Sequence, residues 1–220
     1  MVLWASALIG VVGMPAVVAY GLSRQSPVRA AVFAVGWGAW IVVSAILAAN
    51  DVYRQSAVTA KPWIAIAAGG ALIVALLAVP RAAIMIWPHT LRVIGVAFLI
   101  ALALGTLPAV FALPAGLGDI AVGISAPFIA RRLARGDRTG AVWFNVLGLL
   151  DLVVAVSIGF LAGLGPAQLL PVSPSTVEVT LLPLALIPST AVPLALALHI
   201  RSLLRLRRAP SPVVAAAVNA

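Results

Sequence analysis

The sequence predicts an all-α protein, a polytopic bundle of transmembrane helices, and three observations predict it. Of the 220 residues, 64% are hydrophobic and only 9% are charged. Too few polar side chains remain to cover the surface of a soluble domain. Apolar stretches long enough to cross a bilayer recur along the chain, and the basic residues fall mostly on alternate connections between them. We therefore expect a single transmembrane domain over residues 1–208 and a flexible tail over residues 209–220.

The apolar stretches predict about seven spans. In chain order they cover Val2–Leu22, Ala30–Ala49, Pro62–Val79, Val93–Leu113, Pro114–Ala130, Val142–Leu164 and Val179–Ile200. The fourth and fifth spans are expected to be separated only by a very tight turn, at Leu113-Pro114. The first span lacks the basic residues that precede the apolar core of a signal peptide, so we expect it to be retained.

Basic residues orient these spans. Twelve of the 14 lie on alternate connections: Arg24, Arg29, Arg81, Arg92, Arg131, Arg132, Arg135, Arg138, Arg201, Arg205, Arg207 and Arg208. Only Arg54 and Lys61 lie on the opposite side. Because cytoplasmic connections are enriched in Lys and Arg, this distribution predicts an outside N-terminus, a cytoplasmic C-terminus and an odd number of spans.

The formal net charge of +9 suggests an anionic partner. These arginines lie where lipid headgroups would be, so anionic lipid on the cytoplasmic side is the expected partner, and no nucleic acid is. The predicted headgroup contacts are Arg131, Arg132, Arg135, Arg205, Arg207 and Arg208. The chain has no cysteine, which excludes disulfides and thiolate sites. We expect no metal and no cofactor; a homo-oligomer or a partner membrane subunit is left open.

Two aspartates, Asp119 and Asp151, fall inside apolar spans. An ionisable group at membrane depth costs several kcal/mol unless it is paired, hydrated or protonated, so such a group marks a candidate functional site. Small residues share the helical face of each aspartate, and such faces allow helices to approach closely. The spacing puts Asp119 about 8 Å inside the outer boundary and Asp151 near mid-depth, about one helical turn apart. We expect them to share a polar cavity, with Asn145 nearby.

Each of these sites has a structural alternative. Asp119 follows Pro114, Gly116 and Gly118, and so could cap a helix that begins at Asp119. For Asp151 the alternative is an ordinary hydrogen bond between helices.

The last span carries Pro183, Pro188 and Pro193 around Ser189 and Thr190. Freed carbonyls beside these two hydroxyls would form a cation or solute site. Alternatively, the span is a kinked packing helix whose hydroxyls bond back to the preceding turn.

Two histidines, His89 and His199, are expected at the headgroup level on the cytoplasmic side. A shared haem with both as axial ligands is the competing hypothesis. Trp37 and Trp40 lie inside the second span, where they either line a ligand pocket or pack as ordinary core aromatics.

Two resemblances add to this interpretation. The segment Gly116-Leu117-Gly118-Asp119-Ile120 resembles the GxGD element of the intramembrane aspartyl proteases, the presenilin and signal-peptide-peptidase group. The resemblance implies that Asp119 pairs with a second intramembrane aspartate to activate water. Here, however, Asp151 follows the element, whereas the partner precedes it in that group. No Tyr-Asp pair occurs, and Leu182-Pro183-Leu184-Ala185 only loosely matches the expected Pro-Ala-Leu element.

More of the chain, from Leu91 to Leu206, resembles small bacterial membrane proteins of uncharacterised function. The segments that carry this resemblance are Leu113-Pro114-Ala115-Gly116-Leu117-Gly118-Asp119, Ala126-Pro127, and Leu182 to Pro188 leading to His199. The resemblance implies a multi-pass protein of the bacterial inner membrane.

The sequence leaves three functional hypotheses. The first is a small proton- or cation-linked carrier or permeation protein that uses Asp119, Asp151, Asn145, Ser189 and Thr190. The second is a non-catalytic accessory, assembly or sensory subunit. The third is hydrolysis by two carboxyl groups that share a proton. We expect a protein that is not an enzyme.

Overall fold

The computed structural model describes residues 1–54, 63–79, 85–163 and 168–208. The predicted tail lies outside this part of the chain, as do Arg81 and Lys61. The described α-helices are α1 (Val2–Ser23), α2 (Pro27–Ala49), α4 (Trp63–Ala78), α5 (Val96–Ala103), α6 (Ala109–Ala134), α7 (Ala141–Leu161) and α8 (Val192–Arg208). Three short helical segments join them: η1 (Trp87–Gly95), η3 (Thr176–Thr180) and η4 (Ile187–Ala191). The all-α class that the sequence predicts is therefore confirmed.

Five helices of the described chain are long and apolar enough to cross a membrane: α1, α2, α6, α7 and the continuous pair of η4 and α8. The remaining two apolar helices, α4 and the pair of η1 and α5, are shorter. The structure thus contains helices at all seven predicted places, but only five of them meet the length for a span. The number of seven spans stays a prediction.

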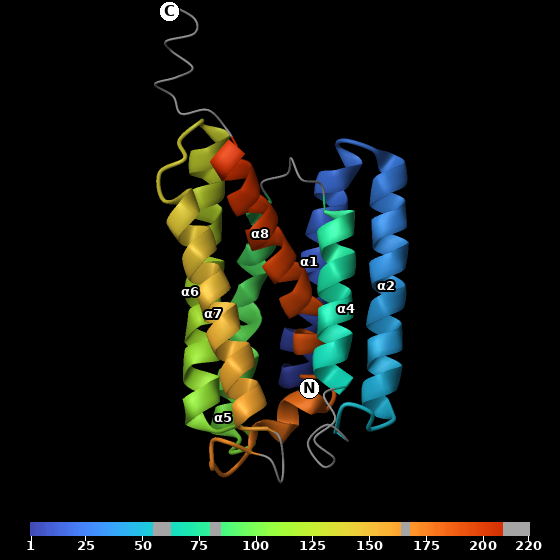
Figure 1. The fold of residues 1–220 in the computed structure, drawn as a ribbon, viewed down its shortest axis with the longest axis vertical. Helices are drawn as coiled ribbons and strands as arrows, with labels where there is room; N and C mark the ends of the chain where they lie inside the picture. Colours follow the sequence, from blue (N-terminus) through green and yellow to red (C-terminus); the bar gives the residue numbers. More distant parts are fainter. Residues whose placement is uncertain (55–62, 80–84, 164–167, 209–220) are drawn as a thin grey trace, which may run out of the picture.

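The helices form one bundle in which α8 lies centrally (Figure 1). In the apolar stretch that η4 and α8 form, 67% of the residues are buried, compared with 22% in α2 and in α7. Leu194 and Leu198 are fully enclosed in the largest hydrophobic cluster, which α1, α2 and α4 complete. A second cluster joins α1, α5 and α6 around Phe98 and Phe111. The central helix is therefore the one whose polar residues are most shielded from surrounding lipid.

The bundle has two ends with different charge. The turn between α1 and α2, the turn between α6 and α7 and the last turn of α8 lie at one end, which we call the arginine end; it is at the top of Figure 1. Arg24, Arg29, Arg131, Arg132 and Arg135 are exposed in or beside these turns. The opposite end, near Met1, contains the start of α4 and the end of α7.

The predicted boundary between the fourth and fifth spans is wrong. The helix does not turn at Leu113-Pro114; it breaks between Ala103 and Ala109, where Gly105 adopts a φ of +73°. A left-handed residue of this kind ends a helix, and glycine takes that conformation without steric cost. Pro114 instead lies inside α6. The reading of Asp119 as a helix cap is also wrong, because α6 begins ten residues earlier.

The predicted seventh span is not one continuous helix from Val179. Residues Thr176–Thr180 form η3, and Ile187–Ala191 form the π-helical turn η4 before α8 begins at Val192. Prolines lack the N–H that continues a helical ladder, so Pro183, Pro188 and Pro193 account for the irregular segment. The regular α-helix of this segment therefore begins only at Val192.

Candidate functional site

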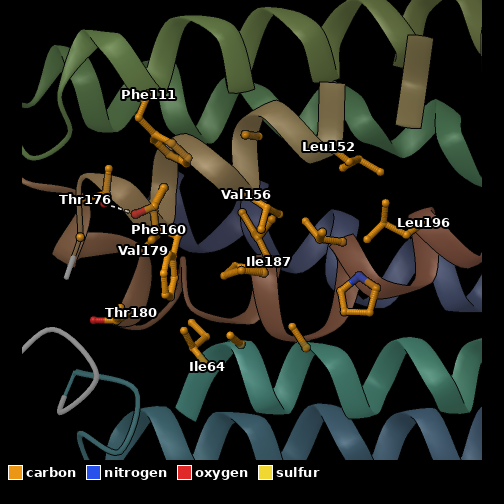
Figure 2. A pocket seen from close by; sticks show the side chains of 18 of the residues that line it. Ile64, Phe111, Leu152, Val156, Phe160, Thr176, Val179, Thr180, Ile187 and Leu196 are labelled. Carbon is orange, nitrogen blue, oxygen red and sulfur yellow. Dashed lines mark hydrogen bonds between the residues drawn. The ribbon is translucent and has the colours of Figure 1, made fainter. Parts of the chain in front are cut away.

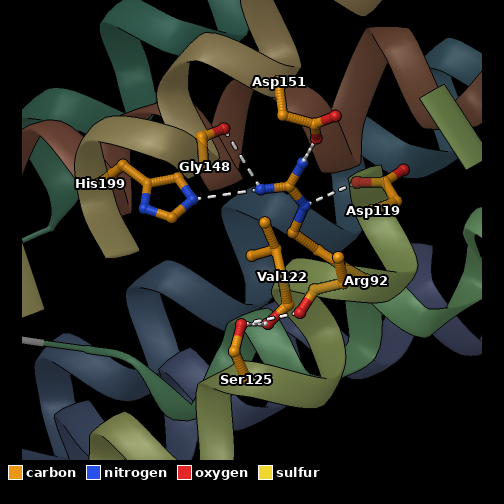
Figure 3. A network of polar contacts seen from close by, with 8 residues as sticks. Arg92, Asp119, Val122, Ser125, Gly148, Asp151 and His199 are labelled. Atoms are coloured by element: carbon orange, nitrogen blue, oxygen red, sulfur yellow. Dashed lines mark hydrogen bonds and ion pairs between the residues drawn. The ribbon is translucent and has the colours of Figure 1, made fainter. Parts of the chain in front are cut away.

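An arginine lies at the centre of the buried polar residues. Arg92 belongs to η1, is only 2% exposed, and binds both intramembrane aspartates (Figure 3). Its Nε donates to Oδ1 of Asp119 at 2.6 Å, and its Nη2 donates to Oδ2 of Asp151. Each aspartate therefore uses one carboxylate oxygen for a different nitrogen of the same guanidinium.

The third nitrogen of Arg92 extends the network to α7 and α8. Nη1 lies 3.3 Å from the carbonyl oxygen of Gly148 and 3.2 Å from Nε2 of His199. A guanidinium can only donate, so Nε2 of His199 must be the acceptor and its proton must lie on Nδ1. Nδ1 then donates to Oδ1 of Asn145 at 2.9 Å. The amide of Asn145 in turn donates to Ala141 at 2.7 Å.

These bonds define a neutral His199 with one tautomer. We call the five connected side chains, Arg92, Asp119, Asn145, Asp151 and His199, the Arg92 network. They come from four separate helical segments, η1, α6, α7 and α8. The network ties these segments together inside the bundle.

His89 lies beside the network without joining it. Its ring stacks on that of His199, with centroids 3.8 Å apart and planes inclined by 20°. The ring of Phe144 lies against both imidazoles, with its centroid 5.7 Å from that of His89 and 5.6 Å from that of His199. Both ring nitrogens of His89 are buried and have no hydrogen-bond partner among the described residues. Two stacked imidazoles cannot sandwich a haem iron, so the shared-haem hypothesis does not fit this arrangement.

Glycines allow the close approach on which the network depends. A Cβ on Gly95 would lie 2.7 Å from the carbonyl oxygen of Gly116, and a Cβ on Gly123 would lie 2.6 Å from the backbone nitrogen of Val93. η1 and α6 therefore pack backbone against backbone. A Cβ on Gly118 would overlap the carboxylate of Asp151, and one on Gly148 would overlap the ring of His199.

The small-residue faces thus mark close packing between helices, as the sequence predicts. The face of Asp119 packs mainly on η1, and Gly148 packs on α8 rather than on α6. The element that was not recognised is η1, whose Arg92 lies between the faces.

The two aspartates lie at the same depth, not one turn apart. Asp119 is ten residues after the start of α6, and Asp151 is ten residues before the end of α7. Those two helix ends lie at the same end of the bundle (Figure 1). At the α-helical rise per residue, ten residues place each aspartate roughly 15 Å from this end of the bundle. The difference from the prediction follows from the early start of α6.

Three positions differ from their predicted places. Arg92 is not a headgroup arginine in a connection, because its side chain is buried and paired. His89 and His199 are each fully buried, so neither is an interfacial histidine. Their charged or basic neighbours in the sequence had suggested the membrane surface. One feature of the sequence could have indicated that Arg92 is buried: the residues that follow it are apolar, as at the start of a buried helix.

Ser189 and Thr190 lie outside the Arg92 network. Their hydroxyls donate to the carbonyl oxygens of Ala185 and Leu186, four residues earlier, at 2.6 and 2.5 Å. This is the pattern of the packing-helix alternative. A ligand role for the two residues stays a prediction. Pro193 lies four residues after Ser189 and has no N–H to donate to the carbonyl oxygen of Ser189. This oxygen accepts a hydrogen bond from Nε1 of Trp40 instead, at 3.0 Å.

Trp40 is therefore a structural donor in this arrangement. Trp37, its neighbour on α2, stacks on Phe33 with ring centroids 5.8 Å apart and is 3% exposed. The two hypotheses for these tryptophans were a ligand pocket and ordinary core packing, and the contacts of Trp37 fit ordinary packing.

The predicted headgroup arginines lie at the arginine end. Arg131, Arg132, Arg135, Arg205 and Arg207 are exposed there, and Arg208 is the last residue of α8. Arg132 pairs with Asp137 at 2.7 Å on the surface. Hydrogen bonds from Thr139 and from Arg132 lower the pKa of Asp137 to about 2. Contact of these arginines with lipid stays a prediction.

A cavity of about 300 Å³ adjoins the network (Figure 2). Its walls are apolar side chains of α4, α7 and α8 and of the second hydrophobic cluster, and Asp119 is among the lining residues. Among the described residues, no group of three or more His, Cys, Asp or Glu side chains could hold a metal ion. The candidate site consists of a buried charged network beside an apolar pocket.

Membrane-length apolar helices around a buried charged network are the features of a multi-pass integral membrane protein. Residues 62–207 match the family described as "Domain of unknown function (DUF8737)", and the chain belongs to this family. The match begins just before α4 and ends within α8, so it includes every residue of the Arg92 network and leaves out α1 and α2. No curated protein and no solved structure matches the chain.

Proposed function

We propose that this protein is a small membrane carrier in which the Arg92 network binds and releases one proton or cation during transport. The observation that carries the proposal is the count of charges in the network. One guanidinium faces two carboxyl groups, and His199 is held as a neutral acceptor. With both aspartates ionised, the network has a net charge of −1.

An uncompensated charge in a low-dielectric interior costs several kcal/mol, so the network favours the addition of one positive charge. A proton on either carboxyl group, or a bound cation, would neutralise it. Each aspartate also has one carboxylate oxygen that accepts no hydrogen bond from the described residues: Oδ2 of Asp119 and Oδ1 of Asp151. These are the atoms at which the exchange would occur.

The geometry gives less support to hydrolysis. Two carboxyl groups that activate water share a proton or a water directly. Here the guanidinium of Arg92 lies between the two carboxyl groups and binds one oxygen of each, so the two groups do not share a proton directly. A hydrolase would have to release Arg92 before each turnover.

The orientation of the carrier follows from its charge. Exposed arginines at one end of the bundle favour a cytoplasmic location for that end, with the N-terminus outside. A multi-pass protein with this bias fits the inner membrane of a bacterium, where anionic headgroups would meet the arginine end. The network then lies near the middle of the bilayer, the usual depth for the sites of secondary transporters.

Flux measurements in proteoliposomes test this proposal. Vesicles with an entrapped pH indicator are given inward and outward gradients of Na⁺, K⁺ or small organic solutes, and proton movement is recorded. The proposal expects movement above the leak of protein-free vesicles, and loss of at least nine tenths of it in Asp119→Asn and in Asp151→Asn.

Asp137→Asn is the matched control. Asp137 also pairs with an arginine, but at the exposed turn between α6 and α7, so its loss should leave the flux within a factor of two. Flux that is equal in all variants would remove the aspartates from the mechanism. No flux under any gradient, together with a stoichiometric partner that co-purifies in mild detergent, would favour an accessory subunit instead.

A further inference from the structure

The apolar pocket beside the network extends along the bundle from one end to mid-depth. Thr176, Val179 and Thr180 of η3 line it near the end opposite the arginines, and Leu152 and Leu196 line it further in (Figure 2). Almost all of its wall is hydrocarbon, and three phenylalanines, Phe98, Phe111 and Phe160, contribute to it. Its volume of about 300 Å³ is within the usual range for sites of small organic ligands.

The pocket opens sideways between two helices. Ala65 and Gly69 of α4 and Val156 and Phe160 of α7 line it and are themselves exposed, so its mouth lies between these helices. Figure 2 shows α7 on one side of the lining residues and α4 on the other, with α8 between them. Both flanking helices are apolar, so in a membrane this mouth faces hydrocarbon. A ligand that partitions into the bilayer can reach the pocket without crossing water.

Asp119 supplies the charge of this pocket. It is the only acidic residue among the described lining residues. Arg92 holds its Oδ1, while its Oδ2 accepts no hydrogen bond from the described residues. The surplus negative charge of the network is therefore available at one wall of an otherwise apolar cavity. A cation with an apolar body complements both properties, and aromatic faces attract such cations as well.

We propose that the pocket binds a lipophilic organic cation, which enters from the bilayer between α4 and α7 and is exchanged for the proton on the network. This inference rests on the proposed carrier function and names its substrate class. Cation and proton neutralise the same single negative charge, so binding of one favours release of the other. The exchange needs no other reactant: the proton leaves a carboxyl group for water, and the cation takes its place.

Binding of tetraphenylphosphonium to the purified protein in detergent tests the proposal. Tetraphenylborate has nearly the same size and shape but the opposite charge, so it separates charge recognition from hydrophobic partition. The phosphonium should bind at least tenfold more tightly than the borate. It should release close to one proton per chain, which an indicator dye in weakly buffered solution can count.

Three variants locate the site. Asp119→Asn should weaken phosphonium binding at least tenfold and abolish proton release. A Cβ on Gly69 or on its neighbour Gly70 meets nothing within 4 Å, but only Gly69 lines the pocket. Gly69→Phe should therefore obstruct the mouth and weaken binding, whereas Gly70→Phe should leave it unchanged. This pair controls for the general effect of a bulky residue on α4.

The possible results separate the two proposals. Equal binding of both probes, or binding that ignores Asp119→Asn and Gly69→Phe, would overturn the pocket assignment and leave only an apolar cavity for lipid chains. If the phosphonium does not bind but ion flux still depends on the two aspartates, the carrier proposal stands and the substrate class is wrong. If the phosphonium binds as expected but no flux occurs, the binding site stands and the carrier proposal fails.

Discussion

His199 packs directly on the backbone of Gly148, where a side chain would overlap its imidazole ring. The same glycine offers its carbonyl oxygen to Arg92. Gly148 thus sets the position of two members of the Arg92 network from a single turn of α7.

We predict that Gly148→Ala displaces His199 and destabilises the protein by about 1–3 kcal/mol, the usual cost of overpacking. Gly36→Ala is the control, because a Cβ there meets nothing within 4 Å; alanine should be neutral or stabilising by up to about 1 kcal/mol. Thermal unfolding in detergent, followed by tryptophan fluorescence, measures both. Equal unfolding temperatures would show that the ring and the helix are not in close contact.

Arg92 should be the most sensitive single position in the bundle. Arg92→Gln leaves both buried carboxyl groups without their cation, and we predict a loss of about 3–5 kcal/mol. Addition of Asp119→Asn to this variant should recover part of the loss, because it removes one of the two acidic groups that Arg92 paired.

The exposed pair of Arg132 and Asp137 provides the comparison for Arg92. Their side chains are 48% and 39% exposed, so Arg132→Gln should change stability by no more than about 1 kcal/mol. Unfolding of the three variants under the same conditions gives the result. An Arg92→Gln protein as stable as Arg132→Gln would mean that Arg92 is not buried between the aspartates.

Trp40 and Pro193 should be coupled through the carbonyl of Ser189. Trp40→Phe removes the indole donor, and a buried carbonyl without a partner costs about 1–3 kcal/mol. Pro193→Ala restores a backbone N–H four residues after Ser189, so Trp40→Phe should cost less in that background. A double-mutant cycle measures the difference; strictly additive effects would contradict the contact.

The sequence was a good guide to what hydrophobicity and local spacing determine. It predicted the all-α class, the places of the apolar helices and the two intramembrane aspartates, and it grouped Asn145 with them. The aspartates could be identified because burying an unpaired acid within an apolar segment is energetically costly, so such an acid requires a partner in any fold.

The identity of that partner depends on tertiary packing and was missed. Arg92 and His199 stand next to apolar segments in the sequence, where the topology rule assigns basic residues to a membrane surface. Arg92 lies inside the bundle because η1 packs closely against α6, with Gly95 of η1 against Gly116 of α6. This packing is a tertiary contact that the sequence pattern does not reveal. Similarly, Pro114 suggested a turn, but it lies inside α6, because a membrane helix can tolerate a proline. The helix breaks at Gly105 instead.

Infrared spectroscopy of the carboxyl groups tests the central claim most directly, namely that the Arg92 network has one negative charge too many and takes up a proton. Asp137 contributes no acid band at neutral pH, because its lowered pKa of about 2 keeps it ionised at every pH well above that value. We predict one protonated-carboxyl band per chain at neutral pH, which disappears in Asp119→Asn and in Asp151→Asn and persists in Asp137→Asn. The absence of this band in the unmodified protein, or its persistence in both intramembrane variants, would contradict the account.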